Sequence, residues 1–128
     1  MKIALLLSGF LRTFNYNNLK EKLINNDNNV DIFIYISKDE YNIDKYLNKK
    51  INIDEIIEKL NPKKIIYENE IDVPKKFKYI NTYRQWYKIY LLNNEKLKYE
   101  YDNSFKYDIV IKSRPDIYLF SKINDYVF

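Results

Sequence analysis

The 128-residue chain contains no cysteine and no histidine. The lack of cysteine excludes disulfide bonds, thiolate metal sites and cysteine nucleophiles. The lack of histidine leaves acid–base chemistry to aspartate, glutamate, tyrosine or lysine. It also leaves any bound metal to oxygen ligands, which favours Mg²⁺ or Mn²⁺ over zinc. No apolar run approaches the ~18 to 20 residues that cross a bilayer. We therefore expect a cytoplasmic protein without a membrane span.

Glycine is scarce as well, because Gly9 is the only one in the chain. It follows Ser8 at the end of an apolar run, residues 2–7, that is typical of a buried strand. A glycine at this point lets the chain turn and lets a ligand approach the backbone closely. Arg12 comes next, ahead of a helix expected over about 15–24. A strand, a glycine, an arginine and a helix can bind a phosphate or a nucleoside, although the glycine-rich patterns of dinucleotide folds and P-loops are absent. A plain turn beside an exposed arginine is the alternative.

The residues that are present predict one folded domain over 1–128. Hydrophobic residues make up 46% of the chain and aromatic residues 17%, which is enough to build a core. The net charge of +4 comes from 22 basic and 18 acidic residues, scattered without a basic block. This pattern favours a solvated surface over a nucleic-acid-binding arm. Tyrosines interleaved with lysines could nevertheless stack bases, so a polyanion-binding module stays open as an alternative.

Strand and helix signals alternate along the chain. Besides 2–7, strands are expected at 30–37, 63–68 and from 107 onward, and helices at 44–47, 54–60 and 81–101. Such alternation is typical of an α/β sandwich of three layers with a mostly parallel central sheet and right-handed crossovers. The second strand ends at Ser37, with Asp39 close behind it, so it brings polar groups to the same edge of the sheet as Ser8.

The longest helix carries an apolar stripe that we expect to face the core. The stripe consists of Ile80, Tyr83, Tyr87, Tyr90, Leu91 and Leu97. Charged and polar side chains, namely Arg84, Lys88, Asn94, Lys96 and Glu100, fall largely outside it. Lys88 or Gln85 could point from this helix toward the ligand edge of the sheet.

The stretch 107–119 joins a strand to a compact charged group. Ile109 to Ile111 are all β-branched, which suits a strand covered on both faces in the middle of a sheet. Pro115 cannot donate to a ladder, so pairing should stop near Arg114. Arg114 could grip phosphate oxygens in a fork, and Asp116 could hold a divalent metal bound to them. A surface Arg–Asp pair at a turn is the alternative.

Several short motifs together resemble a family of GT-A-type glycosyltransferases found in large DNA viruses and in bacterial surface-glycan loci. They are Ser8-Gly9 with Arg12-Thr13, the segment 30–33, the segment 85–88 and the segment 107–116. The resemblance covers nearly the whole chain. It implies a Rossmann-like domain that binds a nucleotide sugar, a UDP- or GDP-sugar, usually with Mn²⁺ or Mg²⁺. The chain would transfer the sugar to a glycan or protein acceptor.

Carried over to this chain, the resemblance gives each residue a role. Asp116 would bind the metal and the diphosphate, and Arg114, in place of the first aspartate of a DxD motif, would stabilise the leaving diphosphate. Ser8, Gly9 and Arg12 would line the nucleotide. Ser37 and Asp39 would lie near the base or ribose. Lys88 would assist at the diphosphate.

The resemblance also implies a second half that shapes the acceptor pocket, whereas the chain ends at Phe128, shortly after the Arg-Pro-Asp motif. We therefore expect a donor-binding half that turns over only with a C-terminal half or a partner. The alternatives are a non-catalytic nucleotide- or polyanion-binding module and a structural remnant that forms homo-oligomers through a sheet edge. The donor-site hypothesis requires the ends of the first and last strands to lie side by side.

Overall fold

The structure is a computed structural model that describes residues 1–9, 16–23, 29–38, 43–44, 49–50 and 52–115. The elements in this part are β1 (Lys2–Ser8), α1 (Tyr16–Lys22), β2 (Asn29–Ser37), β3 (Ile43–Asp44), β4 (Lys49–Lys50), α2 (Ile53–Leu60), β5 (Lys64–Glu68), α3 (Ile80–Asp102) and β6 (Ile109–Ser113). Apart from the two-residue strands β3 and β4, strands and helices alternate as the sequence predicts. Among the described residues, no helix combines the length and the apolar character needed to cross a membrane.

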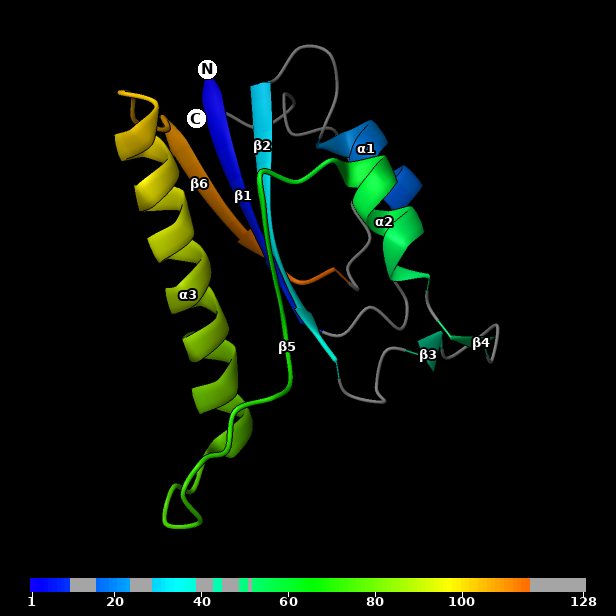
Figure 1. Cartoon of the computed structure of the whole chain (residues 1–128), viewed down its shortest axis with the longest axis vertical. Coiled ribbons are helices and arrows are strands. Elements are labelled where there is room, and N and C mark those ends of the chain that lie inside the picture. Colours follow the sequence, from blue (N-terminus) through cyan, green and yellow to red (C-terminus); the bar gives the residue numbers. More distant parts are fainter. Residues whose placement is uncertain (10–15, 24–28, 39–42, 45–48, 51, 116–128) are drawn as a thin grey trace.

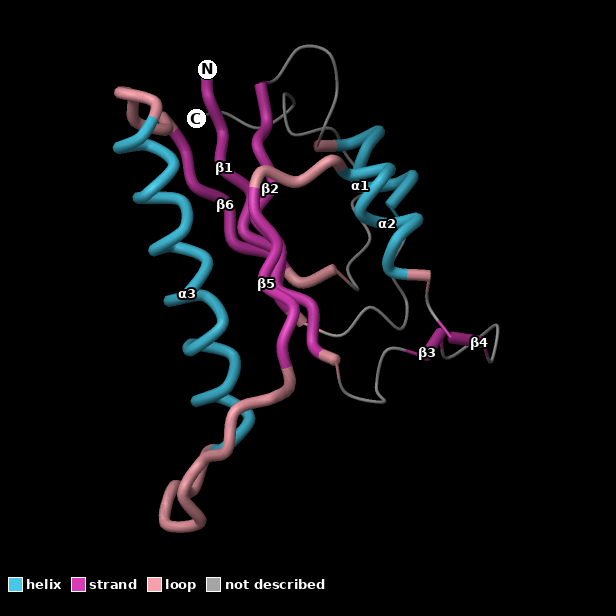
Figure 2. Tube along the Cα trace, in the orientation of Figure 1, coloured by secondary structure: helices cyan, strands magenta, loops and turns pink. Residues whose placement is uncertain are grey.

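The central sheet has the strand order β5-β2-β1-β6, and all its neighbouring strands are parallel. Figure 1 shows α1 and α2 on one side of this sheet and α3 on the other, and Figure 2 shows the same three layers in the backbone trace. This arrangement confirms the predicted α/β class with a parallel sheet and is consistent with a Rossmann-like fold.

Two apolar clusters hold the layers together, one on each face of the sheet. Leu5 and Leu7 of β1 point toward α1 and α2, together with Ile32, Ile34 and Ile36 of β2. Ala4 and Leu6 alternate with them and pack on the opposite face with Phe33, Tyr35 and Leu92. All β1 residues after Lys2 are buried, as expected for a strand covered on both faces.

Helix α2 is delimited by asparagine at both ends. The Asn52 side chain accepts a hydrogen bond from the Glu55 N–H at 3.1 Å, which satisfies one of the unpaired donors of the first turn. Asn61 adopts a left-handed conformation with φ 44°, and its N–H donates to the Ile57 carbonyl, as in a typical helix C-cap. The two asparagines therefore define where α2 begins and ends.

Two predicted elements differ from the structure. The helix expected over 44–47 is wrong at its first residue, because Ile43–Asp44 pairs antiparallel with Lys49–Lys50; residues 45–48 lie outside the described part. Strand β6 is not interior among the described strands. It lies at the edge of the sheet, and Val110 is 44% exposed. A β-branched run thus indicates a strand but not its place in the sheet.

The aromatic stripe of α3 faces the core only in part, because Ile80, Tyr87 and Leu91 are half-buried and Leu91 packs against the core. Tyr83, Tyr90 and Leu97 are exposed, whereas Lys88, Lys96 and Glu100 are buried beside Leu92. The buried charges are paired: Lys96 Nζ donates to Glu100 Oε1 at 2.7 Å, and the Tyr107 N–H donates to Glu100 Oε2 at 2.9 Å. These contacts offset the cost of removing the charges from water, so the polar stripe can face the sheet.

Candidate functional site

The ends of β1 and β6 lie side by side, as the donor-site hypothesis requires. The two strands pair in parallel, with Leu7 opposite Ser113 as the last pair. At their other ends, the Lys2 N–H donates to Asp108 Oδ2 at 2.7 Å and the Asp108 N–H donates to the Lys2 carbonyl at 2.9 Å. These two hydrogen bonds fix the register of the pair, so Ser8 and Arg114 follow as neighbours at the carboxyl edge.

Gly9 lies close to the end of β6 at this edge. Its φ is +136°, a conformation that residues with a side chain rarely adopt. A Cβ at this position would lie 3.2 Å from Pro115 Cδ and 3.9 Å from Arg114 Cβ. Glycine therefore permits the turn out of β1 and also the close approach of the Pro115 ring and the Arg114 side chain.

The order of the strands reverses at this pair. The chain runs from β1 outward to β2 and β5, then returns through α3 to β6 on the other side of β1, as can be followed in Figure 1. In open α/β sheets this reversal opens a crevice beyond the carboxyl ends of the two central strands, where ligands bind. Gly9 and Arg114 stand on either side of that point.

Positive charge gathers near this edge. Arg114 is exposed and follows β6, Lys112 is exposed near the end of β6, and Lys38 is exposed directly after β2. Lys112 Nζ lies 4.1 Å from the centre of the Trp86 ring, and Lys38 Nζ lies 5.0 Å from that of Tyr67. Guanidinium and ammonium groups at the ends of parallel strands are suited to an anionic ligand such as a phosphate.

The two predicted serines lie at the same edge and are buried. Ser8 is 5% exposed and pairs with Tyr35 of β2, while Ser37 is 1% exposed and pairs with Glu68 of β5. They end adjacent strands on the α3 face, but the described structure does not show either hydroxyl exposed to solvent. Their contact with a nucleotide stays a prediction.

Lys88 lies in a buried ionic cluster under α3. Its ammonium group binds the Glu70 carboxylate, and both side chains are less than 10% exposed. Arg84 Nε lies 4.0 Å from Glu70 Oε2 and donates to the Ile71 carbonyl at 3.1 Å. Tyr35, whose ring centre is 5.4 Å from Lys88 Nζ, donates its hydroxyl to Glu68 Oε1 at 2.9 Å. Glu70 thus engages Lys88, and a role for Lys88 toward a diphosphate remains a prediction.

Sequence reasoning missed this ionic cluster. The acidic members come from the end of β5 and the loop after it, and the basic members come from the first half of α3. The sequence predicts Glu68 at the end of a strand and Glu70 in the charged loop after it, and it places Arg84 and Lys88 outside the apolar stripe of the helix. The one available signal was the spacing of Arg84 and Lys88, which places both cations on one side of a helix.

Burial raises the pKa of the Tyr35 hydroxyl above its ordinary value, and the hydrogen bond to Glu68 and the negative charges of Glu68 and Glu70 add to the effect. The phenol therefore stays protonated and keeps donating to Glu68. The Tyr35 hydroxyl thus acts as a hydrogen-bond donor toward Glu68, while the Lys88 ammonium group lies against its ring.

Three predicted site residues, Arg12, Asp39 and Asp116, lie outside the described residues. Within the part of the chain that the structure describes, no group of three or more acidic side chains is placed to hold a metal ion. Glu68 and Glu70 are engaged by Tyr35 and Lys88. The fit of Mn²⁺ or Mg²⁺ therefore depends on Asp116 and stays a prediction.

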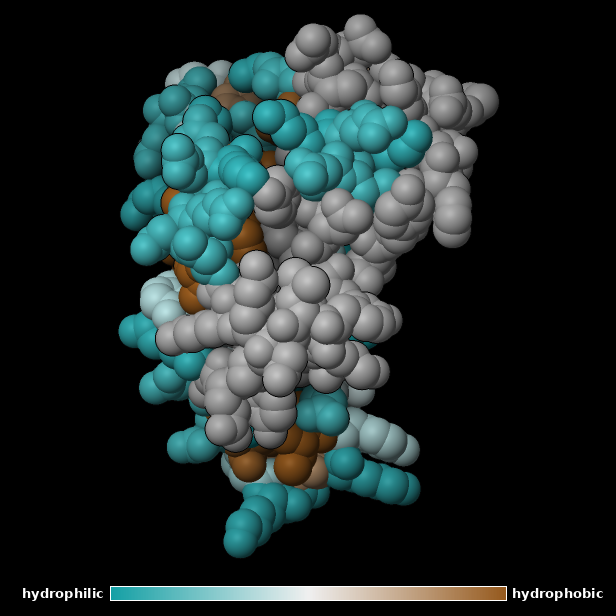
Figure 3. All heavy atoms as spheres, turned by 90° about the vertical axis from the view of Figure 1, so that its right-hand side faces the viewer, coloured by the Kyte–Doolittle hydropathy of each residue, from teal (hydrophilic) through white to brown (hydrophobic). Residues whose placement is uncertain are grey.

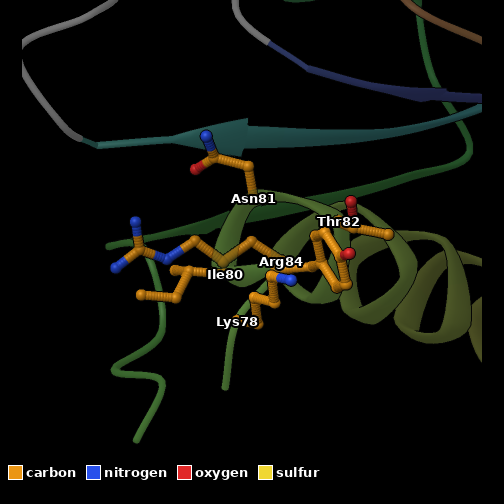
Figure 4. A pocket seen from close by; sticks show the side chains of 6 residues that line it. Lys78, Ile80, Asn81, Thr82 and Arg84 are labelled. Carbon is orange, nitrogen blue, oxygen red and sulfur yellow. The ribbon is translucent and has the colours of Figure 1, made fainter. Parts of the chain in front are cut away.

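An open pocket of about 480 Å³ lies at the N-terminal end of α3. Figure 4 shows its lining side chains, with Lys78, Asn81 and Thr82 around the first turn of the helix and the long Arg84 side chain reaching past it. The helix begins after Tyr79, which makes no side-chain cap hydrogen bond, and not at Asn81 as the sequence predicts. Ser8, Gly9, Ser37, Lys88 and Arg114 do not line this pocket.

Comparisons with known proteins leave the family open: no family model, no curated protein and no solved structure matches this chain.

Proposed function

We propose that this chain binds the diphosphate of a nucleotide sugar at the carboxyl edge between β1 and β6. One observation carries the proposal: Gly9 and Arg114 meet where the strand order reverses. The lack of a side chain at Gly9 lets the end of β1 pass close to Arg114 and Pro115, and the exposed Arg114 supplies a cation with a forked set of donors. Lys38 and Lys112 add positive charge nearby.

The reaction we propose is the transfer of the sugar to a glycan or protein acceptor, with a nucleoside diphosphate as the leaving group. This step rests on the resemblance of the motifs to GT-A-type glycosyltransferases. The bond between the anomeric carbon and the diphosphate oxygen breaks, and negative charge develops on the departing diphosphate. Arg114 would stabilise that charge. Asp116 would hold a divalent cation, which would neutralise the same phosphates.

The test is the binding of UDP- and GDP-sugars, measured by calorimetry and by the shift in melting temperature, with and without Mn²⁺. A ligand that binds only the folded chain raises the melting temperature by mass action. We expect Arg114→Ala to weaken donor binding about 10- to 100-fold, as expected for the loss of charged hydrogen bonds. Asp116→Ala should abolish most of the Mn²⁺ dependence.

Lys64→Ala is the matched control, because Lys64 is an exposed cation at the first residue of β5, the edge strand that β2 and β1 separate from β6. It should leave binding unchanged. If neither nucleotide sugar binds, the proposal is wrong. If a single-stranded oligonucleotide stabilises the chain instead, with a steep salt dependence, the polyanion-binding module replaces it.

A further inference from the structure

The outward face of α3 carries an exposed aromatic row along its whole length. Its members are the N-cap residue Tyr79 (67% exposed), Tyr83 (45%), Trp86 (58%), Tyr90 (63%), Leu97 (50%) and Tyr101 (86%). We call this set the outer stripe. At 100° per residue the six positions fall within about 60° of one another, directly opposite the face that carries Leu92. The spacing of three, four and seven residues is the one that packs against another helix.

The outer stripe itself contains no charged residue, and one cation of β6 contacts it, since Lys112 Nζ lies 4.1 Å from the centre of the Trp86 ring. The positions that flank the stripe on the same side of the helix are Thr82, Tyr87, Asn93 and Asn94, which are uncharged, and Glu100, which is buried and paired with Lys96, although charged residues make up 31% of the chain. The outward sides of α1 and α2 are different: Lys20, Glu21, Asp54, Glu58 and Lys59 are exposed there, and Figure 3 shows a hydrophilic surface over these helices. Few charges and many tyrosine and tryptophan side chains are the signature of a protein interface core.

We infer that the outer stripe is the interface of a homodimer in which α3 packs antiparallel on α3 of a second copy. The positions of the stripe are symmetric about Tyr90. An antiparallel pair centred there places Tyr79 against Tyr101 of the second copy and Tyr83 against Leu97 of the second copy. Trp86 meets Asn94 of the second copy, whose small side chain leaves room for the indole. A two-fold interface requires this kind of self-complementary surface.

Antiparallel packing also suits the helix dipoles. The positive N-terminal end of each α3 would lie beside the negative C-terminal end of the other, whereas a parallel pair would place like ends together. A helix of 23 residues is about 34 Å long, which is long enough for six turns of contact.

The exposed area is of the size that a stable dimer needs. The five aromatic side chains of the outer stripe are about half to nine-tenths exposed. At about 150–250 Å² for each whole side chain, they offer roughly 600 Å² to a partner. Leu97 and the polar rim extend this patch, toward the roughly 800 Å² per partner of a standard interface. The dimer does not depend on the proposed nucleotide site.

The first test is sedimentation equilibrium of the full chain from nanomolar to high micromolar concentration. We expect a reversible monomer–dimer equilibrium. Tyr90→Glu, which brings two carboxylates together at the two-fold axis, should weaken the dimer by about 30-fold or more, as for a central interface residue. Tyr67→Glu is the control, because Tyr67 is an exposed tyrosine (49%) on β5, away from α3, and should leave the dimer unchanged.

The second test uses the lack of cysteine in the chain. Tyr90→Cys should form a disulfide between copies on mild oxidation, because the two-fold axis brings the two positions together. Tyr83→Cys and Leu97→Cys should cross-link when mixed but not alone. A chain that stays monomeric at high concentration, a dimer that Tyr90→Glu leaves intact, or a disulfide of Tyr83→Cys with itself would each overturn the inference. So would a monomer that binds single-stranded RNA through Trp86.

Discussion

A Cβ atom at Gly9 would lie 3.2 Å from Cδ of Pro115, a residue 106 positions later in the chain. This closeness joins the turn after β1 to the end of β6. The only glycine of the chain therefore stands where two strand ends pass each other at the reversal of the sheet.

Gly9→Ala should destabilise the fold. The φ of +136° is strained for alanine, and the new methyl group would push against Pro115. We expect a loss of about 1–3 kcal/mol in the free energy of unfolding, measured by urea denaturation. Adding Pro115→Ala should recover only the part that comes from the contact, because the backbone strain remains. A Gly9→Ala variant with an unchanged free energy of unfolding would contradict the described turn.

Lys88→Met should cost more than an ordinary helix substitution. It leaves the Glu70 carboxylate buried without its ammonium partner, a change that costs about 3–5 kcal/mol. The double variant Lys88→Met with Glu70→Leu should regain most of the loss, since the unpaired charge is gone as well. Denaturation of all four proteins in a double-mutant cycle measures the coupling. Additive effects of the two single changes would show that the pair is not coupled.

Acid should weaken the fold through Glu100. Burial alone would raise the pKa of its carboxyl, but the hydrogen bonds from Lys96 and from the Tyr107 N–H, with the positive charges of Lys96 and Lys106, hold it below the ordinary 4.5. The stabilisation is complete above the unfolded-state pKa and is lost as the pH falls through the lower folded-state pKa. Glu100→Gln should therefore flatten the loss of stability below about pH 4.5. If Glu100→Gln loses stability below about pH 4.5 as steeply as the parent chain does, the Glu100 carboxylate is not paired as described.

Alkali should reveal two protected tyrosines. Burial raises the pKa of Tyr107, and the hydrogen bond to Asp31 Oδ2, 2.6 Å from the hydroxyl, raises it further; Tyr35 is raised in the same way. Their contribution to stability is full below the ordinary pKa of 10.0 and is lost as the pH rises through the folded-state values. Tyrosinate absorbance of the folded chain should thus leave at least these two of the 14 tyrosines unionised just above pH 10. Tyr107→Phe should remove one of them.

Local sequence predicted the strands that carry the candidate site. The residues Ile3 to Leu7 are all apolar, which favours the interior of a sheet, so β1 follows from the residues alone. Gly9 and Pro115 then mark the ends of β1 and β6, because one permits a positive φ and the other cannot donate a hydrogen bond. Both properties belong to the residue type itself, so they can be read from the sequence without knowledge of tertiary contacts.

The face of α3 could not be predicted in this way. Helical spacing gives two stripes on opposite sides, one aromatic and one with Lys88, Lys96 and Glu100. Because burying a charge costs free energy, sequence reasoning favours the aromatic stripe as the one that faces the core. Glu70 and the Tyr107 N–H reverse that preference, because they pair with the charges. Both come from segments outside the helix, so the helix sequence holds no sign of them.

The sequence by itself determined the order of the four parallel strands and of the three helices that cover them, and that a glycine, an arginine and a proline stand at strand ends, since these depend on backbone sterics and short-range spacing. Only the tertiary structure decided that β1 and β6 are neighbours at the reversal of the sheet and that the aromatic side of α3 faces outward. Both outcomes depend on contacts between residues far apart in the chain, whose energies no local pattern contains.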